Sequence, residues 1–308
     1  MRRIFAAAAA MVCCSSAFAQ PQIDYSKLEI KTTDFGHGVY LLGWQGGDSL
    51  ILVGDDGVLL VDTSVAQMGD KIKAAIAKVS SKPLRWVVNT HAHADHFGAN
   101  EAMAKDGALI VAHEGLRERM EKGQYLAAFN QTIPPSPPAA LPKVTYVDAM
   151  TLHFDGETVE LVHVPNAHTD NDTIVHFKRA NVIHASGTFG GAGAYPFFDM
   201  SSGGSLAGMI AAEEKMLSFA DANTKIMADE GEPASTEALK ATHDMLVALR
   251  ARVQKLIDEG KSEDQVVAAK PIQGLGDSWE HAAGFLNADT FTRMAYQSLK
   301  GIRPPAAR

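Results

Sequence analysis

Three histidines and one aspartate lie within six residues of each other, in the stretch His-x-His-x-Asp-His that runs from His91 to His96. His91 and His93 are two residues apart, so on an extended backbone they share a face, whereas Asp95 and His96 follow a turn. Imidazole and carboxylate donors together suit a borderline divalent ion, zinc first. Without a cation, so many cationisable side chains in contact would be unfavourable. The pattern therefore predicts a metal site.

The elements on either side of this stretch explain how it could be positioned. Residues 86–88 and Thr90 are apolar or β-prone and indicate a short buried strand, and a helical pattern opens after Gly98. A strand, a ligand-rich loop and a helix in this order direct side chains to a point beyond a sheet edge. Asp62, at the end of an earlier predicted strand, either caps the next helix or orients a ligating histidine.

The His91–His96 motif resembles that of the metallo-β-lactamase superfamily of metallohydrolases. In that family the third histidine of the first metal site lies in a polar loop between two strands, often followed by threonine and acidic residues. Here the loop 165–172 contains His168-Thr169-Asp170. The resemblance implies a first zinc site made of His91, His93 and His168, with an open coordination position.

The second metal site departs from the family pattern at two positions. The family usually places a bridging aspartate after the strand equivalent to 182–185, where this chain has Gly187, and a histidine where this chain has Glu230. The resemblance thus implies a second site of Asp95, His96 and Glu230, and one or two zinc ions per chain. Glu230 capping the following helix is the alternative. The cysteine-free subclass of metallo-β-lactamases also lacks the bridging carboxylate.

Glycine and aromatic residues are concentrated in residues 189–204. We predict that this segment covers the metal cleft and shapes a substrate pocket, although its aromatic side chains could equally be buried in the core. The candidate substrate-binding residues are Ser186, Phe189, Tyr195 and Phe197.

Short strands followed by helices occur on both sides of a proline-rich stretch, residues 133–142, which we interpret as a stiff connection between two halves. This order predicts an α+β fold with two mixed sheets packed face to face and helices outside, and the resemblance implies the same four-layer αββα sandwich. Residues 20–308 are predicted to form a single domain with a helical appendage at about 261–308. Strands are predicted at 29–33, 39–43, 49–53, 58–61, 86–88, 108–112, 144–147, 151–154, 158–164, 173–177, 182–185 and 224–228, and helices at 66–79, 205–219, 235–259, 262–268 and 288–300.

Residues 1–19 have the pattern of a secretory signal peptide. Two arginines precede an alanine-rich apolar run, and a small-x-small cleavage signal follows at residues 17–19. The apolar run is too short for a permanent membrane span. We therefore expect export across the inner membrane to the periplasm. Both cysteines, Cys13 and Cys14, lie in this segment, so the mature chain would have no disulfide and no thiolate ligand.

The net charge of −8 argues against a nucleic acid or an anionic membrane as partner. A small-molecule substrate is expected, with no membrane anchor and no evident protein partner. The resemblance implies a zinc-dependent hydrolase that attacks an amide, lactone, ester, thioester or phosphoester with an activated hydroxide. In this mechanism Asp95 orients the hydroxide or accepts its proton.

Three alternatives to this function stay open. The first is a periplasmic β-lactamase resembling the cysteine-free subclass. The second is an iron-bound redox or sulfur-oxidising member of the superfamily, whose metal is held by two histidines and a carboxylate. The third is a degenerate metal-binding protein without activity, suggested by Gly187 and Glu230.

Overall fold

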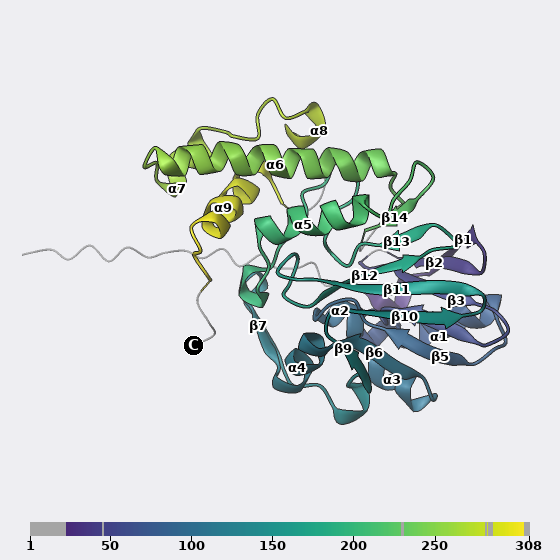
Figure 1. The fold of residues 1–308 in the computed structure, drawn as a ribbon. Coiled ribbons are helices and arrows are strands. Elements are labelled where there is room, and N and C mark those ends of the chain that lie inside the picture. The colour runs from purple at the N-terminus through teal and green to yellow at the C-terminus, as the bar shows by residue number, and fades with distance from the viewer. Residues whose placement is uncertain (1–22, 45, 229–230, 281, 283–285, 305–308) are drawn as a thin grey trace, which may run out of the picture.

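Two β-sheets lie at the centre of the computed structural model, which describes residues 23–44, 46–228, 231–280, 282 and 286–304 (Figure 1). Within these residues the first sheet has the strand order β1-β2-β3-β4-β5-β6-β9. Strands β1 to β4 pair antiparallel, and β4, β5, β6 and β9 pair parallel. The bounds are β1 Lys31–Gly36, β2 Val39–Gly43, β3 Ser49–Val53, β4 Val58–Val61, β5 Leu84–Val88, β6 Leu109–His113 and β9 Val144–Tyr146.

The second sheet has the order β10-β11-β12-β13-β14. Its strands pair antiparallel except for β13 and β14, which are parallel. Strand β12 is buried at every position, as expected for a strand covered on both faces. The bounds are β10 Ala149–Phe154, β11 Glu157–Val164, β12 Asp172–Phe177, β13 Val182–His184 and β14 Lys225–Met227.

Helices cover the outer faces of both sheets (Figure 1). Helices α1 and α3 pack on the first sheet and α5 and α6 on the second, whereas α9 packs against α5, α6 and α7. The short α2 and the longer α4 follow β5 and β6. The bounds are α1 Gly69–Val79, α2 Ala94–Phe97, α3 Asn100–Lys105, α4 Glu114–Lys122, α5 Leu206–Leu217, α6 Thr236–Asp258, α7 Glu263–Ala268, α8 Asp277–Glu280 and α9 Ala288–Leu299.

Three apolar layers separate these four layers of backbone. The central layer joins side chains of both sheets, such as Leu50 and Val61 from the first and Leu161 and Phe177 from the second. A second apolar layer lies between the first sheet and α1 and α3. A third lies between the second sheet and α5 and α6, and it continues among the helices to Phe291 of α9. Because each sheet buries both faces, the predicted α+β, four-layer αββα sandwich is confirmed.

The proline-rich stretch 133–142 does not connect the two halves, contrary to the prediction. The strand after it, β9, still belongs to the first sheet, and the chain crosses to the second sheet between β9 and β10. Ala140 and Leu141 are buried in an apolar cluster with Leu116 of α4. The stretch therefore packs against the first half because it carries apolar side chains as well as prolines.

Two further features concern the predicted secondary structure and the predicted helical appendage. A hairpin of β7 (Gln124–Leu126) and β8 (Gln131–Ile133) was not predicted from the sequence. The C-terminal helices share the apolar layer of α5 and α6, to which Val266 of α7 contributes. No helix in the described part of the chain is both long and apolar enough to cross a membrane. The predicted signal peptide lies outside the described residues.

Candidate metal centre

Three histidines from two separate segments converge beyond the ends of the sheets. His91 and His93 follow β5, and His168 lies in the loop between β11 and β12. One ring nitrogen of each lies within 4.8 Å of the other two, and all three residues are buried. His93 has an extended backbone directly before α2, so the chain turns after it. The structure thus brings together the three residues predicted for the first metal site.

In each of the three rings one nitrogen faces the other histidines, and the opposite nitrogen is the outer nitrogen. The outer nitrogen of His91, Nδ1, is hydrogen-bonded to Thr90, and Thr90 is hydrogen-bonded to a buried carboxylate. Thr90 donates its hydroxyl hydrogen to Asp62 Oδ2 at 2.6 Å, so its oxygen accepts from His91 Nδ1, 3.1 Å away. His91 Nδ1 therefore carries the ring hydrogen, and Nε2 keeps its lone pair. That Nε2 is buried and has no hydrogen-bond partner among the described residues.

The outer nitrogens of His93 and His168 face acceptors that come from one short segment. His93 Nε2 lies 3.2 Å from Asp199 Oδ2, and His168 Nδ1 lies 2.6 Å from the Phe197 carbonyl oxygen. A carbonyl or an ionised carboxylate can only accept, so both outer nitrogens carry hydrogens. The inner nitrogens, His93 Nδ1 and His168 Nε2, then turn their lone pairs toward each other across 2.9 Å.

A divalent cation fits this arrangement because it would satisfy three converging lone pairs at once. Burial, followed by the charges of His96, His168 and His93, holds the pKa of His91 well below its usual value. The ring is therefore neutral, which is the form that ligates a metal. Three imidazole ligands with an outer hydrogen-bond partner each, and a fourth position open, are typical of catalytic zinc sites.

Asp62 is the buried carboxylate behind the site, and it orients a ligand candidate instead of capping a helix. Besides the Thr90 hydroxyl, Oδ2 accepts from His96 Nδ1 at 2.8 Å, and Oδ1 accepts from the Thr90 backbone N–H at 2.8 Å. The backbone of Asp62 is left-handed, with φ of 60°, a conformation that needs support from its surroundings. The short helix that follows has no side-chain cap.

Of the three residues predicted for the second metal site, the structure describes Asp95 and His96. His96 is buried, and its Nε2 lies 3.7 Å from Oδ2 of Asp95, whose side chain is 51% exposed. Desolvation by the neighbouring rings opposes ionisation of Asp95, but the charges of His96 and His93 outweigh it and keep the pKa of Asp95 below its usual value. Gly187 offers no side-chain donor, and Glu230 lies outside the described residues. Within the described part of the chain, only His91, His93 and His168 form a cluster of metal donors.

The loop that carries His168 is fastened to residues 197–205 by backbone hydrogen bonds. Asp199 N–H donates to the His168 carbonyl at 2.7 Å, and Ser205 N–H donates to the Ala167 carbonyl at 2.9 Å. The two segments approach so closely that an added Cβ at Gly204 would lie 2.3 Å from the His168 carbonyl oxygen. An added Cβ at Gly208 would lie 1.8 Å from the Asn166 carbonyl oxygen. These two glycines therefore permit close packing behind a ligand.

The four candidate substrate-binding residues lie in different environments. Ser186 is fully buried, and its hydroxyl oxygen accepts from Thr173 N–H at 3.3 Å. Phe189 and Tyr195 belong to the apolar layer of the helices, where Tyr195 stacks on Phe291 with ring centroids 4.6 Å apart. Phe197 is partly exposed, and its ring lies 5.7 Å from that of His168. A role in substrate binding stays a prediction for all four residues. Phe197 is the best placed of them, because its ring lies beside that of His168.

The β7–β8 hairpin contacts the metal loop, and sequence reasoning missed it. The Gln124 side chain donates to the carbonyl of Ala92, which lies between two ligand histidines. Ala127 N–H donates to Ser201 Oγ at 3.1 Å, and Phe129 contacts the Phe197 ring. Strands of only three residues give almost no periodic signal, so only the tertiary structure places the hairpin beside the site.

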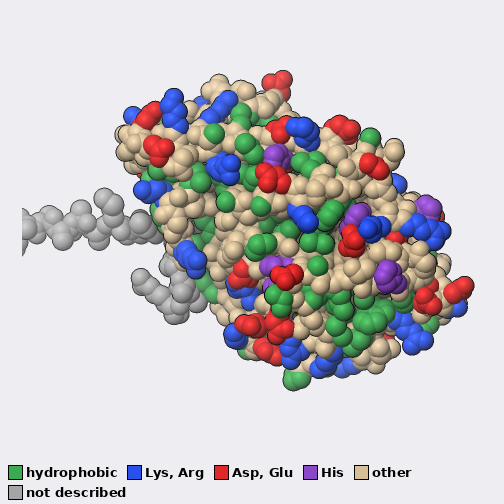
Figure 2. All heavy atoms as spheres, in the orientation of Figure 1, with side chains coloured by type: hydrophobic (Ala, Val, Ile, Leu, Met, Phe, Trp, Pro, Cys, Tyr) green, Lys and Arg blue, Asp and Glu red, His purple; other side chains and the backbone are tan. Residues whose placement is uncertain are grey.

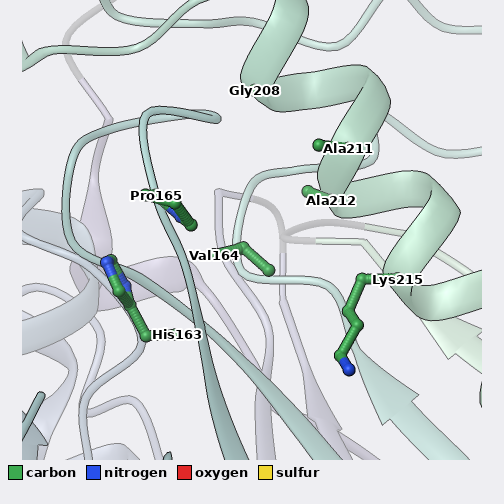
Figure 3. Close-up of a pocket in the computed structure, with 7 residues that line it drawn as sticks. All are labelled: His163, Val164, Pro165, Gly208, Ala211, Ala212 and Lys215. Atoms are coloured by element: carbon green, nitrogen blue, oxygen red, sulfur yellow. The ribbon is translucent and has the colours of Figure 1, made fainter. Parts of the chain in front are cut away.

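A hollow of about 220 Å³ lies between the end of β11 and α5, apart from the metal centre (Figure 3). Its walls are mostly apolar, with Val164 and Pro165 on one side and Ala211 and Ala212 on the other. None of the three ligand histidines lines it. It therefore does not take part in the candidate site.

Comparison with known proteins identifies the class to which this fold and histidine cluster belong. The family model described as the metallo-beta-lactamase superfamily matches residues 42–190, which include the whole His91–His96 motif and His168. The structural neighbours share the sandwich. The matched part of the chain, residues 42–190, therefore resembles the metallo-beta-lactamase superfamily.

The individual proteins that resemble this chain share only 17% to 25% of its sequence where they match. The chain is 25% identical over 146 residues to the alpha subunit of 2,4-dinitroanisole O-demethylase from Nocardioides sp. (strain JS1661), a match covering 46% of this chain and 40% of that protein. Among solved structures, the stereoselective inverting sec-alkylsulfatase Pisa1 from Pseudomonas sp. is 17% identical with a TM-score of 0.64, over 87% of this chain and 50% of that one. The metallo-beta-lactamase FIM-1 from Pseudomonas aeruginosa, in its mono-zinc form, is 17% identical with a TM-score of 0.56, over 71% and 95%. The chain thus spans about half the length of the alkylsulfatase, and these likenesses describe the fold.

Proposed function

We propose that this chain is a metal-dependent hydrolase whose reaction centre is the cluster of His91, His93 and His168. The observation that carries the proposal is the convergence of three buried imidazole lone pairs, each fixed by an outer hydrogen bond. A zinc-type ion bound there supplies Lewis acidity and a hydrolytic nucleophile near neutral pH.

The side chains around the cluster have separate roles in this proposal. The three buried rings hold the ion and keep water away from its protein side. Asp95, the exposed member of the motif, orients the attacking water from the solvent side. Asp62 holds His96 in one ring orientation beside Asp95. A second ion, if the chain binds one, would use Asp95, His96 and Glu230.

The substrate is proposed to be a small molecule with an ester-like bond: an amide, lactone, carboxylic ester, thioester or phosphoester. The relatives widen this range, since one is named a sec-alkylsulfatase and another an O-demethylase of 2,4-dinitroanisole. Sulfate esters therefore belong among the candidates. The β-lactamase alternative is supported by neighbours that are metallo-beta-lactamases, one of them in a mono-zinc form.

Metal analysis separates the remaining alternatives. Iron in the protein as isolated would favour the redox alternative, and bound metal without turnover of any substrate would favour the degenerate metal-binding protein. Two zinc ions per chain would support Glu230 as a ligand, whereas one would place the chemistry on the three histidines alone.

The decisive experiment compares the native chain with His91→Ala. Metal content is measured by elemental analysis after zinc reconstitution, and hydrolysis is assayed on chromogenic carboxylic, phosphate and sulfate esters and on a chromogenic β-lactam. His153→Ala is the matched control, because His153 is an exposed strand histidine away from the cluster. We expect loss of metal and turnover in His91→Ala only. A folded His91→Ala protein with native metal content and full turnover would refute the proposal.

We further propose that the protein is exported to the periplasm and acts without a nucleic-acid or membrane partner. The net charge of −8 supports the second part. On the face shown in Figure 2, lysine, arginine and acidic side chains are interspersed without a continuous basic patch. Cell fractionation, with N-terminal sequencing of the mature chain, tests the export and the cleavage after residue 19.

A further inference from the structure

We propose that Asp199 is a positioning residue that fixes His93 in the tautomer able to bind the metal through Nδ1. The carboxylate is the hydrogen-bond acceptor at the outer nitrogen of His93, and it comes from a segment beyond the part of the chain that carries the family motif. The inference rests on the proposed metal site.

Both carboxylate oxygens of Asp199 accept hydrogen bonds inside the protein. The residue is only 2% exposed. Oδ1 accepts from Ser201 N–H at 2.9 Å and from the Ser201 hydroxyl, and Oδ2 accepts from the Ser202 hydroxyl at 2.6 Å and from His93 Nε2 at 3.2 Å.

A fixed tautomer matters because an imidazole has one lone pair for a metal. With hydrogen on Nε2, the lone pair of His93 lies on Nδ1 and points toward His168 Nε2, 2.9 Å away. With hydrogen on Nδ1, the same ring would present an N–H to the metal position and could not ligate there. Partners of this kind at the outer nitrogen typically change metal affinity by about 10- to 100-fold.

The substitution Asp199→Asn would impose the wrong tautomer. An asparagine has one accepting oxygen, and the backbone N–H of Ser201 can only donate, so that oxygen must stay on the Ser201 side. The amide NH₂ then faces Ser202 Oγ, which can turn to accept, and His93 Nε2, which must give up its hydrogen. The ring hydrogen of His93 would move to Nδ1.

The substitution Asp199→Ala acts differently, because it removes the acceptor without introducing a donor. Both tautomers of His93 then become accessible, and the metal can select the correct one. We therefore expect zinc affinity to fall in the order native, Asp199→Ala, Asp199→Asn. A purely structural role predicts the reverse order for the two variants, since asparagine preserves the volume and most hydrogen bonds of the buried site.

The experiment measures two quantities on folded full-length chains, verified by circular dichroism. Zinc affinity is determined by competition with a chromogenic chelator. The His93 tautomer is read from long-range ¹H–¹⁵N spectra of the metal-free protein at pH 8, with His93→Gln for assignment. Ser202→Ala is the matched control, because it removes a donor from the same carboxylate oxygen without touching His93.

We expect an Nε2–H tautomer in the native chain and in Ser202→Ala, an Nδ1–H tautomer in Asp199→Asn, and an affinity loss of about 10- to 100-fold in Asp199→Asn. An unchanged tautomer in Asp199→Asn, or an equal affinity loss in Ser202→Ala, would overturn the inference. If Asp199→Ala does not fold, Asp199→Asn and Ser202→Ala decide it. A native chain that binds no zinc would refute the proposed function instead, and the tautomer spectra would still test Asp199.

Discussion

Glu213 on α5 provides the sharpest test of the packing outside the metal centre. The residue is fully buried in the helical apolar layer, beside Met209, Ile210 and Met216 on the same helix. Neither carboxyl oxygen has a hydrogen-bond partner within the described residues. Burial alone raises the pKa of Glu213 well above its usual value. Folding therefore requires a neutral carboxyl group at a pH where the unfolded chain ionises it.

The sign and size of the effect follow from proton linkage. A carboxyl group with a raised pKa in the folded state contributes stability below its unfolded pKa and loses it as pH rises toward the folded pKa. Within that window the free energy of unfolding falls by about 1.4 kcal/mol per pH unit. Glu213→Gln removes the titration, so its stability relative to the native chain should increase by this amount per unit. Glu213→Leu also removes the unpaired oxygens, and its free energy of unfolding should increase by about a further 1–3 kcal/mol.

The assay is urea unfolding followed by circular dichroism at pH 5.5, 6.5 and 7.5, with equal zinc saturation of all chains. Glu259→Gln is the matched control, since Glu259 is exposed at the end of α6 and the chemical change is identical. A difference between native and Glu213→Gln chains that does not change with pH would show that Glu213 is ionised in the folded protein. The reasoning would then be wrong.

Two further substitutions test the support of the metal ligands. Asp62→Asn places an NH₂ group against His96 Nδ1 and the Thr90 hydroxyl, because the remaining oxygen must accept from the Thr90 backbone N–H. We expect a loss of about 1–3 kcal/mol in the free energy of unfolding, measured in urea, and reduced turnover. Native values of both quantities would contradict the assigned hydrogen bonds. Gly208→Ala puts a Cβ 1.8 Å from the Asn166 carbonyl oxygen, so α5 and the His168 loop must separate. We expect a loss of about 1–3 kcal/mol in the free energy of unfolding together with weaker zinc binding. Unchanged zinc affinity would show that the loop does not depend on this contact.

Periodicity of apolar residues was enough to predict most of the elements. Strands β2, β3 and β4 have the predicted bounds, and α6 differs from its prediction by one residue at each end. Their apolar residues alternate or recur at helical spacing because each element buries a defined face. The hairpin of β7 and β8 and the true crossing after β9 were not predicted, since very short strands carry little periodicity and pairing partners are set by distant residues.

The sequence by itself indicated His91 and His93 through their spacing on one segment, whereas His168, in a later polar loop, was indicated by the resemblance to a known family. Local spacing sufficed for His91 and His93, because two residues on an extended chain share a face whatever the rest of the protein does. Only the tertiary structure decided which groups hold the outer nitrogens. Asp199 is 106 residues from His93, and Asp62 is 34 residues from His96. Nothing in the local pattern links such pairs, since their contact depends on how the two sheets and the segment before α5 pack against each other.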